Sequence, residues 1–133
     1  EALPDSRWII VHDAARPLAD DGLVTAGLAS ARMTGAVAAA VPITDTVKSA
    51  DDQLMISKTV PRDGLWAAQT PQVFSRAVLA DAHQRVSETV TDDAEMVERL
   101  GGRVQLFTGS PSNVKITTPD DLPIVEAVLR TRA

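Results

Sequence analysis

Polar side chains that could bind a phosphorylated, polyhydroxylated small molecule follow several short apolar runs in this sequence. They are four cations, three hydroxyls and two carboxylates: Asp13, Arg16, Thr46, Lys48, Arg62, Thr70, Thr91, Asp92 and Lys115. Arginine grips phosphate through a fork of N–H donors, and lysine neutralises it as a point charge. Phosphoryl-type transfer requires mainly positioning and charge neutralisation from the protein, and no nucleophilic side chain. The set therefore indicates a phosphate-handling site.

Most members of this set also have a structural alternative. Thr91 and Asp92 are favourable helix N-caps, Thr70 precedes a proline and suits a turn, and Arg62 could be a solvated surface charge. Lys115 is the hardest to explain in this way, because it lies inside an apolar extended segment. Burying an amine there without a partner would be costly.

The apolar run at residues 9–11 predicts a buried strand that ends at His12 and Asp13. In open α/β sheets, ligands bind beyond the carboxyl ends of strands, where Asp13 could hold a cation and Arg16 a phosphate. Alternatively, Asp13 caps the following turn and pairs with Arg16 at the surface. We interpret His12 as a hydrogen-bonded core residue and not as a ligand.

The elements around this strand predict an α/β domain. A helix is expected over residues 22–33, capped by Asp20 and Asp21 and stopped by Gly35, before a second buried strand at residues 36–41. Such a strand–helix–strand unit implies parallel pairing of the two strands through a right-handed crossover.

Residues 43–68 lack a helical period and contain short extended runs, which predicts a two-stranded polar arm with a turn at Asp51 and Asp52. A two-stranded ribbon is marginal in isolation, so we expect the arm to pack on a partner subunit. A floppy surface excursion is the alternative.

Helices and strands alternate in the rest of the chain. Ser75 should cap a helix that runs to about Val86, and residues 91–93 should precede a short helix that ends at residues 100–102. Residues 104–107 and 113–117 are expected to be extended. Residues 118–121 resemble a capping box, followed by a helix whose Leu122, Val125 and Val128 or Leu129 face inward.

Composition restricts the classes of function. The chain has 133 residues, 44% of them apolar, and no run long enough to span a membrane, which predicts one domain. It has no cysteine, so disulfides, zinc thiolates and cysteine nucleophiles are excluded. A net charge of −5 argues against a nucleic-acid surface. With no signal peptide in these residues, we expect a cytoplasmic protein that acts on a small molecule.

No glycine-rich phosphate loop of the GxGxxG or Walker A type occurs in the sequence. The chain starts at Glu1 without a methionine and runs almost directly into its first strand. We therefore expect it to be the carboxyl-terminal part of a larger domain, with any triphosphate-binding loop outside these residues.

Five blocks, in this order, resemble the 2-C-methyl-D-erythritol 4-phosphate cytidylyltransferase family. They lie at residues 11–17, 42–48, 62–72, 91–94 and 109–117, so the resemblance covers nearly the whole chain. It implies a Rossmann-like, mostly parallel sheet of the nucleotidyltransferase type with a protruding β-arm at residues 43–68. Residues 1–133 would then be a partial domain that lacks the family's amino-terminal glycine-rich loop.

The resemblance implies transfer of a cytidylyl group from CTP to 2-C-methyl-D-erythritol 4-phosphate, with release of pyrophosphate, in non-mevalonate isoprenoid biosynthesis. Arg62 and Lys115 would be the catalytic residues that hold the acceptor phosphate. The acceptor would also contact Asp13, Arg16, Thr46, Thr70 and Thr91. Asp13 and Ala14 would contact the nucleotide, and Asp13 would lie near Mg²⁺. The implied enzyme is a homodimer in which Thr46 and Arg62 serve the partner's site.

Two alternatives to this function remain. Pentitol-phosphate cytidylyltransferases, which act on acceptors such as ribitol 5-phosphate, share several of the blocks. A non-catalytic module that binds a sugar phosphate or mediates dimerisation is also compatible with a chain that lacks the phosphate loop. Because that loop is absent, we expect these residues alone to lack turnover.

Overall fold

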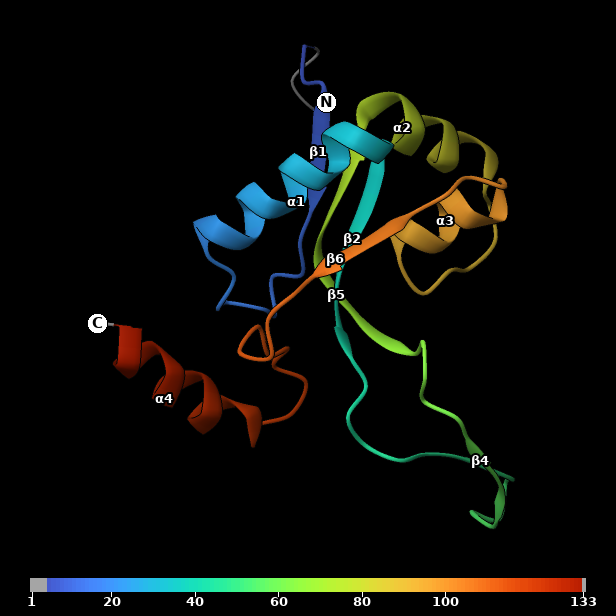
Figure 1. Cartoon of the computed structure of the whole chain (residues 1–133), viewed down its shortest axis with the longest axis vertical. Coiled ribbons are helices and arrows are strands. Elements are labelled where there is room, and N and C mark those ends of the chain that lie inside the picture. The colour runs from blue at the N-terminus through green and yellow to red at the C-terminus, as the bar shows by residue number, and fades with distance from the viewer. Residues whose placement is uncertain (1–4, 133) are drawn as a thin grey trace.

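The computed structural model describes residues 5–132, and a four-stranded mixed sheet forms its centre (Figure 1). The strands, in the order in which they lie side by side, are β1 (Trp8–Val11), β5 (Trp66–Ser75), β2 (Ala36–Pro42) and β6 (Gln105–Thr108). β5 runs antiparallel to both neighbours, while β2 and β6 pair in parallel. Three of the four strands therefore run in the same direction, and the predicted α/β class with a parallel-containing sheet is confirmed.

One predicted pairing is wrong. β1 and β2 run in the same direction, but they do not pair, because β5 lies between them. Residues 66–74 return the chain to the core, as expected, but they do so as the longest strand of the sheet. Val73 and Phe74 are fully buried, so this strand belongs at the centre and not at an edge.

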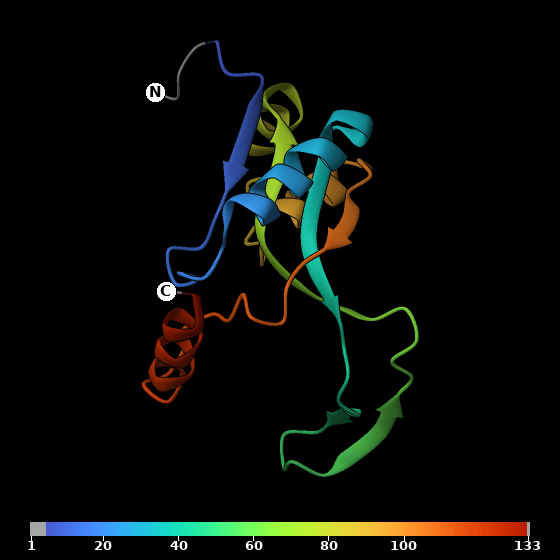
Figure 2. The same ribbon diagram turned by 60° about the vertical axis from the view of Figure 1, so that its left-hand side comes forward.

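Helices cover both faces of the sheet. α1 (Asp21–Thr34) packs on one face, and α2 (Arg76–Arg85) and α3 (Asp93–Arg99) pack on the other, as Figure 2 shows with α1 in front. β2 serves both layers because its side chains alternate: Val37 faces α1, and Ala36 and Ala38 face α2 and α3. These small side chains let the helices approach the strand closely.

The helix ends follow the predicted capping. The carboxylate of Asp20 accepts the Leu23 N–H at 2.8 Å, and α1 ends at Gly35, whose φ of 84° favours glycine. The hydroxyl of Ser75 caps α2, and the carboxylate of Asp92 caps α3. The cap that starts α3 matters for the site, because it fixes the loop at Thr91.

Within the predicted arm at residues 43–68 the chain forms a separate two-stranded ribbon, while residues 66–68 already belong to β5 of the main sheet (Figure 2). β3 (Val47–Ala50) pairs antiparallel with β4 (Ile56–Val60). Asp51 makes the turn, since its Oδ1 accepts from the N–H groups of Gln53 and Met55. The tip exposes apolar side chains, with Leu54 85% exposed.

The carboxyl-terminal helix differs in part from prediction. α4 (Asp121–Arg132) places Pro123 in its first turn, where an N–H has no helical partner, so no bond is lost. Val125 is buried as expected, but Leu122 and Leu129 remain about half exposed. Residues 113–117 precede this helix as an irregular loop and not as a strand.

Within residues 5–132, no helix is both long enough and apolar enough to cross a membrane.

Candidate functional site

A cavity of about 250 Å³ opens where β1, β5, the loop before α3 and the loop after β6 meet. Its lining combines cations, carboxylates, hydroxyls and amides: Asp13, Arg16, Ala68, Gln69, Thr70, Gln72, Thr91, Asp92 and Lys115. The structure thus brings together six of the polar residues that the sequence singled out. Asp13 lies just beyond the carboxyl end of β1, as expected for a ligand-binding edge.

Two cations share one carboxylate in this cavity. Lys115 Nζ lies 3.0 Å from Asp13 Oδ2, and Arg16 Nε lies 3.4 Å from the same oxygen. The hydrogen bond from Lys115 is the main cause of a lowered Asp13 pKa, which the Arg16 charge lowers further and partial burial opposes. With Asp13 ionised, Lys115, Arg16 and Asp13 together leave one positive charge on this side of the cavity, and Asp92 adds a second carboxylate to the lining.

The turn at residues 13–16 is held from two sides. The Arg16 N–H donates to the Asp13 carbonyl at 3.0 Å, which closes the turn. Arg16 Nη1 donates to the Asn113 carbonyl at 2.7 Å, and the Ile116 N–H donates to the Ala15 carbonyl at 2.8 Å. The loop that carries Lys115 and the turn that carries Asp13 are thus bound to each other. Ala14 is exposed on this turn, outside the cavity lining.

Thr70 and His12 form a hydrogen-bonded chain behind Asp13. The Thr70 Oγ1 accepts from the Asp13 N–H at 2.9 Å and lies 2.9 Å from His12 Nδ1. His12 Nε2 faces the Arg16 carbonyl at 3.0 Å and must donate to it, so in the neutral ring Nδ1 is the acceptor. The Thr70 hydroxyl therefore donates to His12. His12 is hydrogen-bonded as predicted, but it is exposed on the turn and does not lie in the core.

Thr91 and Asp92 line the cavity and also organise α3. The N–H and the hydroxyl of Thr91 both donate to Glu95 Oε2, at 2.7 and 2.8 Å. These bonds, with Arg99, lower the Glu95 pKa to about 2. Asp92 Oδ1 caps the helix at the Glu95 N–H, as the structural alternative predicted. The proton of the Thr91 hydroxyl is committed to Glu95, so Thr91 can only accept hydrogen bonds from a ligand.

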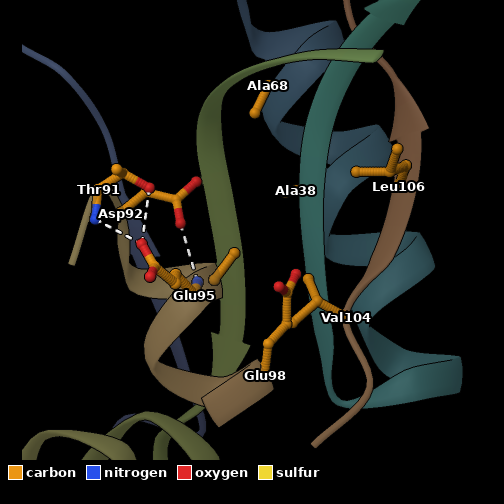
Figure 3. A pocket seen from close by; sticks show the side chains of 9 residues that line it. Ala38, Ala68, Thr91, Asp92, Glu95, Glu98, Val104 and Leu106 are labelled. Atoms are coloured by element: carbon orange, nitrogen blue, oxygen red, sulfur yellow. Dashed lines mark hydrogen bonds between the residues drawn. The ribbon is translucent and has the colours of Figure 1, made fainter. Parts of the chain in front are cut away.

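A second cavity of about 520 Å³ adjoins the first and shares Ala68, Thr91 and Asp92 with it. Figure 3 shows Thr91, Asp92 and Glu95 on one side of it, and Val104 and Leu106 on the other. The charged side chains that line it among residues 5–132 are carboxylates, of Asp92, Glu95 and Glu98. The smaller cavity, which holds Lys115 and Arg16, is therefore the candidate phosphate site.

The two predicted site residues on the arm lie outside the cavity. Thr46 and Arg62 are exposed, and Arg62 Nη1 donates to the Thr44 carbonyl within the arm. Lys48 also stays within the arm, with Nζ 2.6 Å from Thr59 Oγ1. The structure of a single chain therefore does not bring these residues to Asp13 and Lys115.

Three buried amides support the site, and the sequence analysis did not single them out. Gln69 donates to the Ser110 carbonyl and accepts from the Ser110 N–H. Gln72 donates to the Asp92 carboxylate and accepts from the Ala94 N–H. Asn113 donates to the Thr70 carbonyl. Single-sequence patterns carry no signal for burial of Gln or Asn, because these residues are mostly exposed. Their position inside the blocks at residues 62–72 and 109–117 was the available hint.

The fold and the cavity define a class of protein: an α/β domain whose strand ends present a cavity lined by two cations, two carboxylates and two hydroxyls, which suits a phosphorylated polyol. Comparison with known proteins specifies the family. The family model IspD, 2-C-methyl-D-erythritol 4-phosphate cytidylyltransferase, matches residues 1–131. The chain belongs to this family.

Relatives of the same name match almost the whole chain. The protein from Dehalococcoides mccartyi is 45% identical over 129 residues, which are 97% of this chain and 57% of the relative. The protein from Prochlorococcus marinus is 45% identical over 137 residues, which are 100% of this chain and 61% of the relative. The chain thus spans less than two thirds of these curated relatives.

Solved structures agree with the fold. The crystal structure of 2-C-methyl-D-erythritol 4-phosphate cytidylyltransferase from Thermus thermophilus superposes with a TM-score of 0.85 at 37% identity, covering 93% of this chain and 62% of that one. The 4-diphosphocytidyl-2C-methyl-D-erythritol synthase from Anaerococcus prevotii gives a TM-score of 0.85 at 32% identity, covering 97% and 62%. The chain is therefore similar to nucleotidyltransferases over nearly all of its length.

Proposed function

We propose that the full-length protein that contains this chain transfers a cytidylyl group from CTP to 2-C-methyl-D-erythritol 4-phosphate, releasing pyrophosphate, in non-mevalonate isoprenoid biosynthesis. Membership of the family supports the reaction. One observation supports a role for residues of this chain: Lys115 and Arg16 converge on Asp13 in a cavity that is also lined by hydroxyls. Cations placed in this way reduce the repulsion between two phosphate groups.

In this reaction an oxygen of the acceptor phosphate attacks the α-phosphorus of CTP in line. The new P–O bond forms as the bond between the α-phosphorus and the oxygen bridging to the β-phosphate breaks, and pyrophosphate takes the electron pair. Because the acceptor phosphate is already an anion, no general base is needed. The contribution of the protein is to hold two anions together and to neutralise the charge that develops.

We assign the following roles to the residues of the cavity. Lys115 holds the acceptor phosphate and Arg16 adds a second phosphate contact, while Asp13 lies between acceptor and nucleotide. Thr70 and Thr91 accept hydrogen bonds from acceptor hydroxyls, because each donates its own proton within the protein.

Ala14 is assigned to the nucleotide. It is exposed on the turn that follows β1, beside Asp13. Its small side chain would let the cytosine ring approach the backbone.

Mg²⁺ fits this donor set. Within residues 5–132, no three His, Cys, Asp or Glu side chains form a metal-binding group. Mg²⁺ is commonly held by one or two carboxylates together with substrate phosphates, and Asp13 supplies one such carboxylate at the cavity. Bound there, the ion would neutralise negative charge on the nucleotide phosphates.

We further propose a homodimer in which the arm carries Thr46 and the catalytic Arg62 into the partner's cavity. Both residues lie outside the cavity of their own chain, and the arm exposes an apolar tip with no core of its own. Arg62 would then join the partner subunit's Lys115 at the acceptor phosphate.

Binding of the CTP triphosphate is assigned to residues outside this chain, because no glycine-rich loop occurs among the 133 residues. We also propose a cytoplasmic location.

The test is pyrophosphate release by the full-length protein with CTP and Mg²⁺. We expect turnover with 2-C-methyl-D-erythritol 4-phosphate and far less with ribitol 5-phosphate. A preference for ribitol 5-phosphate would instead make the protein a pentitol-phosphate cytidylyltransferase. Binding of either acceptor without pyrophosphate release would identify a non-catalytic module.

A further inference from the structure

A buried amide connects the parts of the chain that build the candidate site. Asn113 is 1% exposed and lies two residues before Lys115. Its Nδ2 donates to the Thr70 carbonyl at 2.7 Å and faces Gln69 Oε1 at 3.4 Å. Gln69 Oε1 is an acceptor in its other contact too, with the Ser110 N–H. Because both neighbours are acceptors, the amide must present its nitrogen to β5.

The backbone around Asn113 holds the opposite side of the cavity. Its carbonyl accepts from Arg16 Nη1 at 2.7 Å, and the Ile116 N–H donates to the Ala15 carbonyl at 2.8 Å. The segment 113–116 is therefore attached to β5 by one side chain and to the Asp13–Arg16 turn by its main chain. Lys115 lies between these attachments.

A role as core filler does not explain this residue. Asn113 Oδ1 is buried and has no hydrogen-bond partner within residues 5–132. A buried acceptor without a partner costs free energy, so an apolar side chain would fill the space at lower cost. What Asn113 provides is a donor that attaches segment 113–116 to β5, beyond the point where Gln69 holds the Ser110 backbone.

We propose that Asn113 is a positioning residue. It holds the backbone of the Lys115 loop in the place from which Lys115 and Arg16 both reach Asp13. Lys115 has a long side chain that is 45% exposed, so its place depends on where its backbone is held. A cation fixed in advance at the reacting phosphate needs no reorganisation during the reaction. The kinetic consequence rests on the proposed function, but the structural consequence does not.

The structural test compares Asn113→Ala with Leu79→Ala in the full-length protein by amide hydrogen exchange. Leu79 is buried on α2 in the core cluster, so its substitution destabilises the fold without touching the cavity. We expect Asn113→Ala to speed exchange of the Ile116 N–H about tenfold more than exchange of the β5 amides, because a local attachment is lost. Leu79→Ala should speed both alike. If Asn113→Ala speeds exchange of the Ile116 N–H and of the β5 amides equally, the proposal is overturned. If the alanine variant does not fold, Asn113→Ser is used in its place.

The kinetic test is a double-mutant cycle with Lys115→Ala. We expect Asn113→Ala to lower kcat/KM for the acceptor about tenfold. Lys115→Ala should then cause a smaller further loss than it does in the wild-type protein, because both changes remove the contribution of a correctly placed Lys115. Leu79→Ala should leave the Lys115 effect unchanged. Full additivity in an active enzyme would contradict the positioning role. If the wild-type protein releases no pyrophosphate, the proposed function fails and the exchange result alone decides the role of Asn113.

Discussion

Lys115 and Arg16 bind the same Asp13 oxygen, and this determines how each cation can act on a phosphate. In the described chain, the Asp13 carboxylate holds Lys115 Nζ at 3.0 Å while Arg16 is tied by the Asn113 carbonyl. In the proposed reaction an acceptor phosphate would meet both cations already in place, Lys115 on Asp13 and Arg16 on the Asn113 carbonyl. Lys115 is the more exposed cation of the pair, at 45% against 12% for Arg16.

At the scale of single residues, Lys115→Ala in the full-length protein should lower kcat/KM by two to three decades, which corresponds to roughly 3 kcal/mol of transition-state stabilisation. The same loss is expected for Arg62→Ala. Pyrophosphate release at varied acceptor concentration measures it. Arg85→Ala is the control, because Arg85 pairs with Asp81 on the exposed face of α2 and lies outside the cavity lining. Near-normal turnover of Lys115→Ala would contradict the assigned role.

Thr70→Val should weaken the site by removing the acceptor of the Asp13 N–H and the donor to His12. We expect a roughly tenfold lower kcat/KM for the acceptor, because a partly buried N–H loses its hydrogen bond and Asp13 is less firmly placed. Thr70→Ser keeps the hydroxyl and should retain most of the activity. Equal kinetics for the valine and serine variants would show that the hydroxyl has no such role.

The charged residues of the cavity were predictable from sequence, whereas the buried amides that hold the surrounding segments in place were not. Asp13 follows a β-branched run, and Lys115 interrupts an apolar segment, so both differ from their surroundings. The bonds made by Gln72 and Asn113 join residues 20 to 97 positions apart. No local pattern encodes such contacts, because they depend on how the strands are ordered.

At the scale of elements, the position of β5 in the sheet could likewise not be predicted from local sequence patterns. Capping residues fixed the ends of α1, α2 and α3 close to the predicted positions, because caps act within a few residues. The insertion of β5 between β1 and β2 is a long-range event that no capping or periodicity signal records. This insertion is nevertheless what places Thr70 next to Asp13.

The α3 terminus should make stability depend on pH. In the folded chain the Glu95 pKa is lowered from 4.5 to about 2, mainly by the Thr91 N–H and then by Arg99 and the Thr91 hydroxyl. A lowered carboxyl pKa adds stability above the ordinary value, and this stability is lost as the pH falls through the folded pKa. We therefore expect Glu95→Gln to flatten the fall in the free energy of unfolding between pH 4.5 and about 2. Urea unfolding at several pH values measures it, and curves that stay parallel would exclude this contribution.

At the scale of the whole molecule, the arm is the basis of the proposed dimer. Its ribbon projects away from the sheet, and Leu54, Met55 and Ile56 are 64–85% exposed at its tip (Figure 1). Contiguous exposed apolar residues on a monomer commonly mark an interaction surface. An arm that crosses to a second copy would bury this tip and also bring Arg62 to a cavity that already holds Lys115.

Mixed dimers provide the decisive test of this arrangement. If Arg62 acts in the partner's site, a dimer of one Arg62→Ala chain and one Lys115→Ala chain has one site with both substitutions and one site with neither. Refolding equal amounts of the two inactive variants together should then restore about one quarter of the wild-type activity, because about half of the dimers are mixed and each has one intact site. If Arg62 acts within its own chain, both sites of the mixed dimer carry one substitution, and no activity should return. Molecular mass by light scattering must show dimers in every sample, since a monomeric wild-type protein would remove the basis for a shared site.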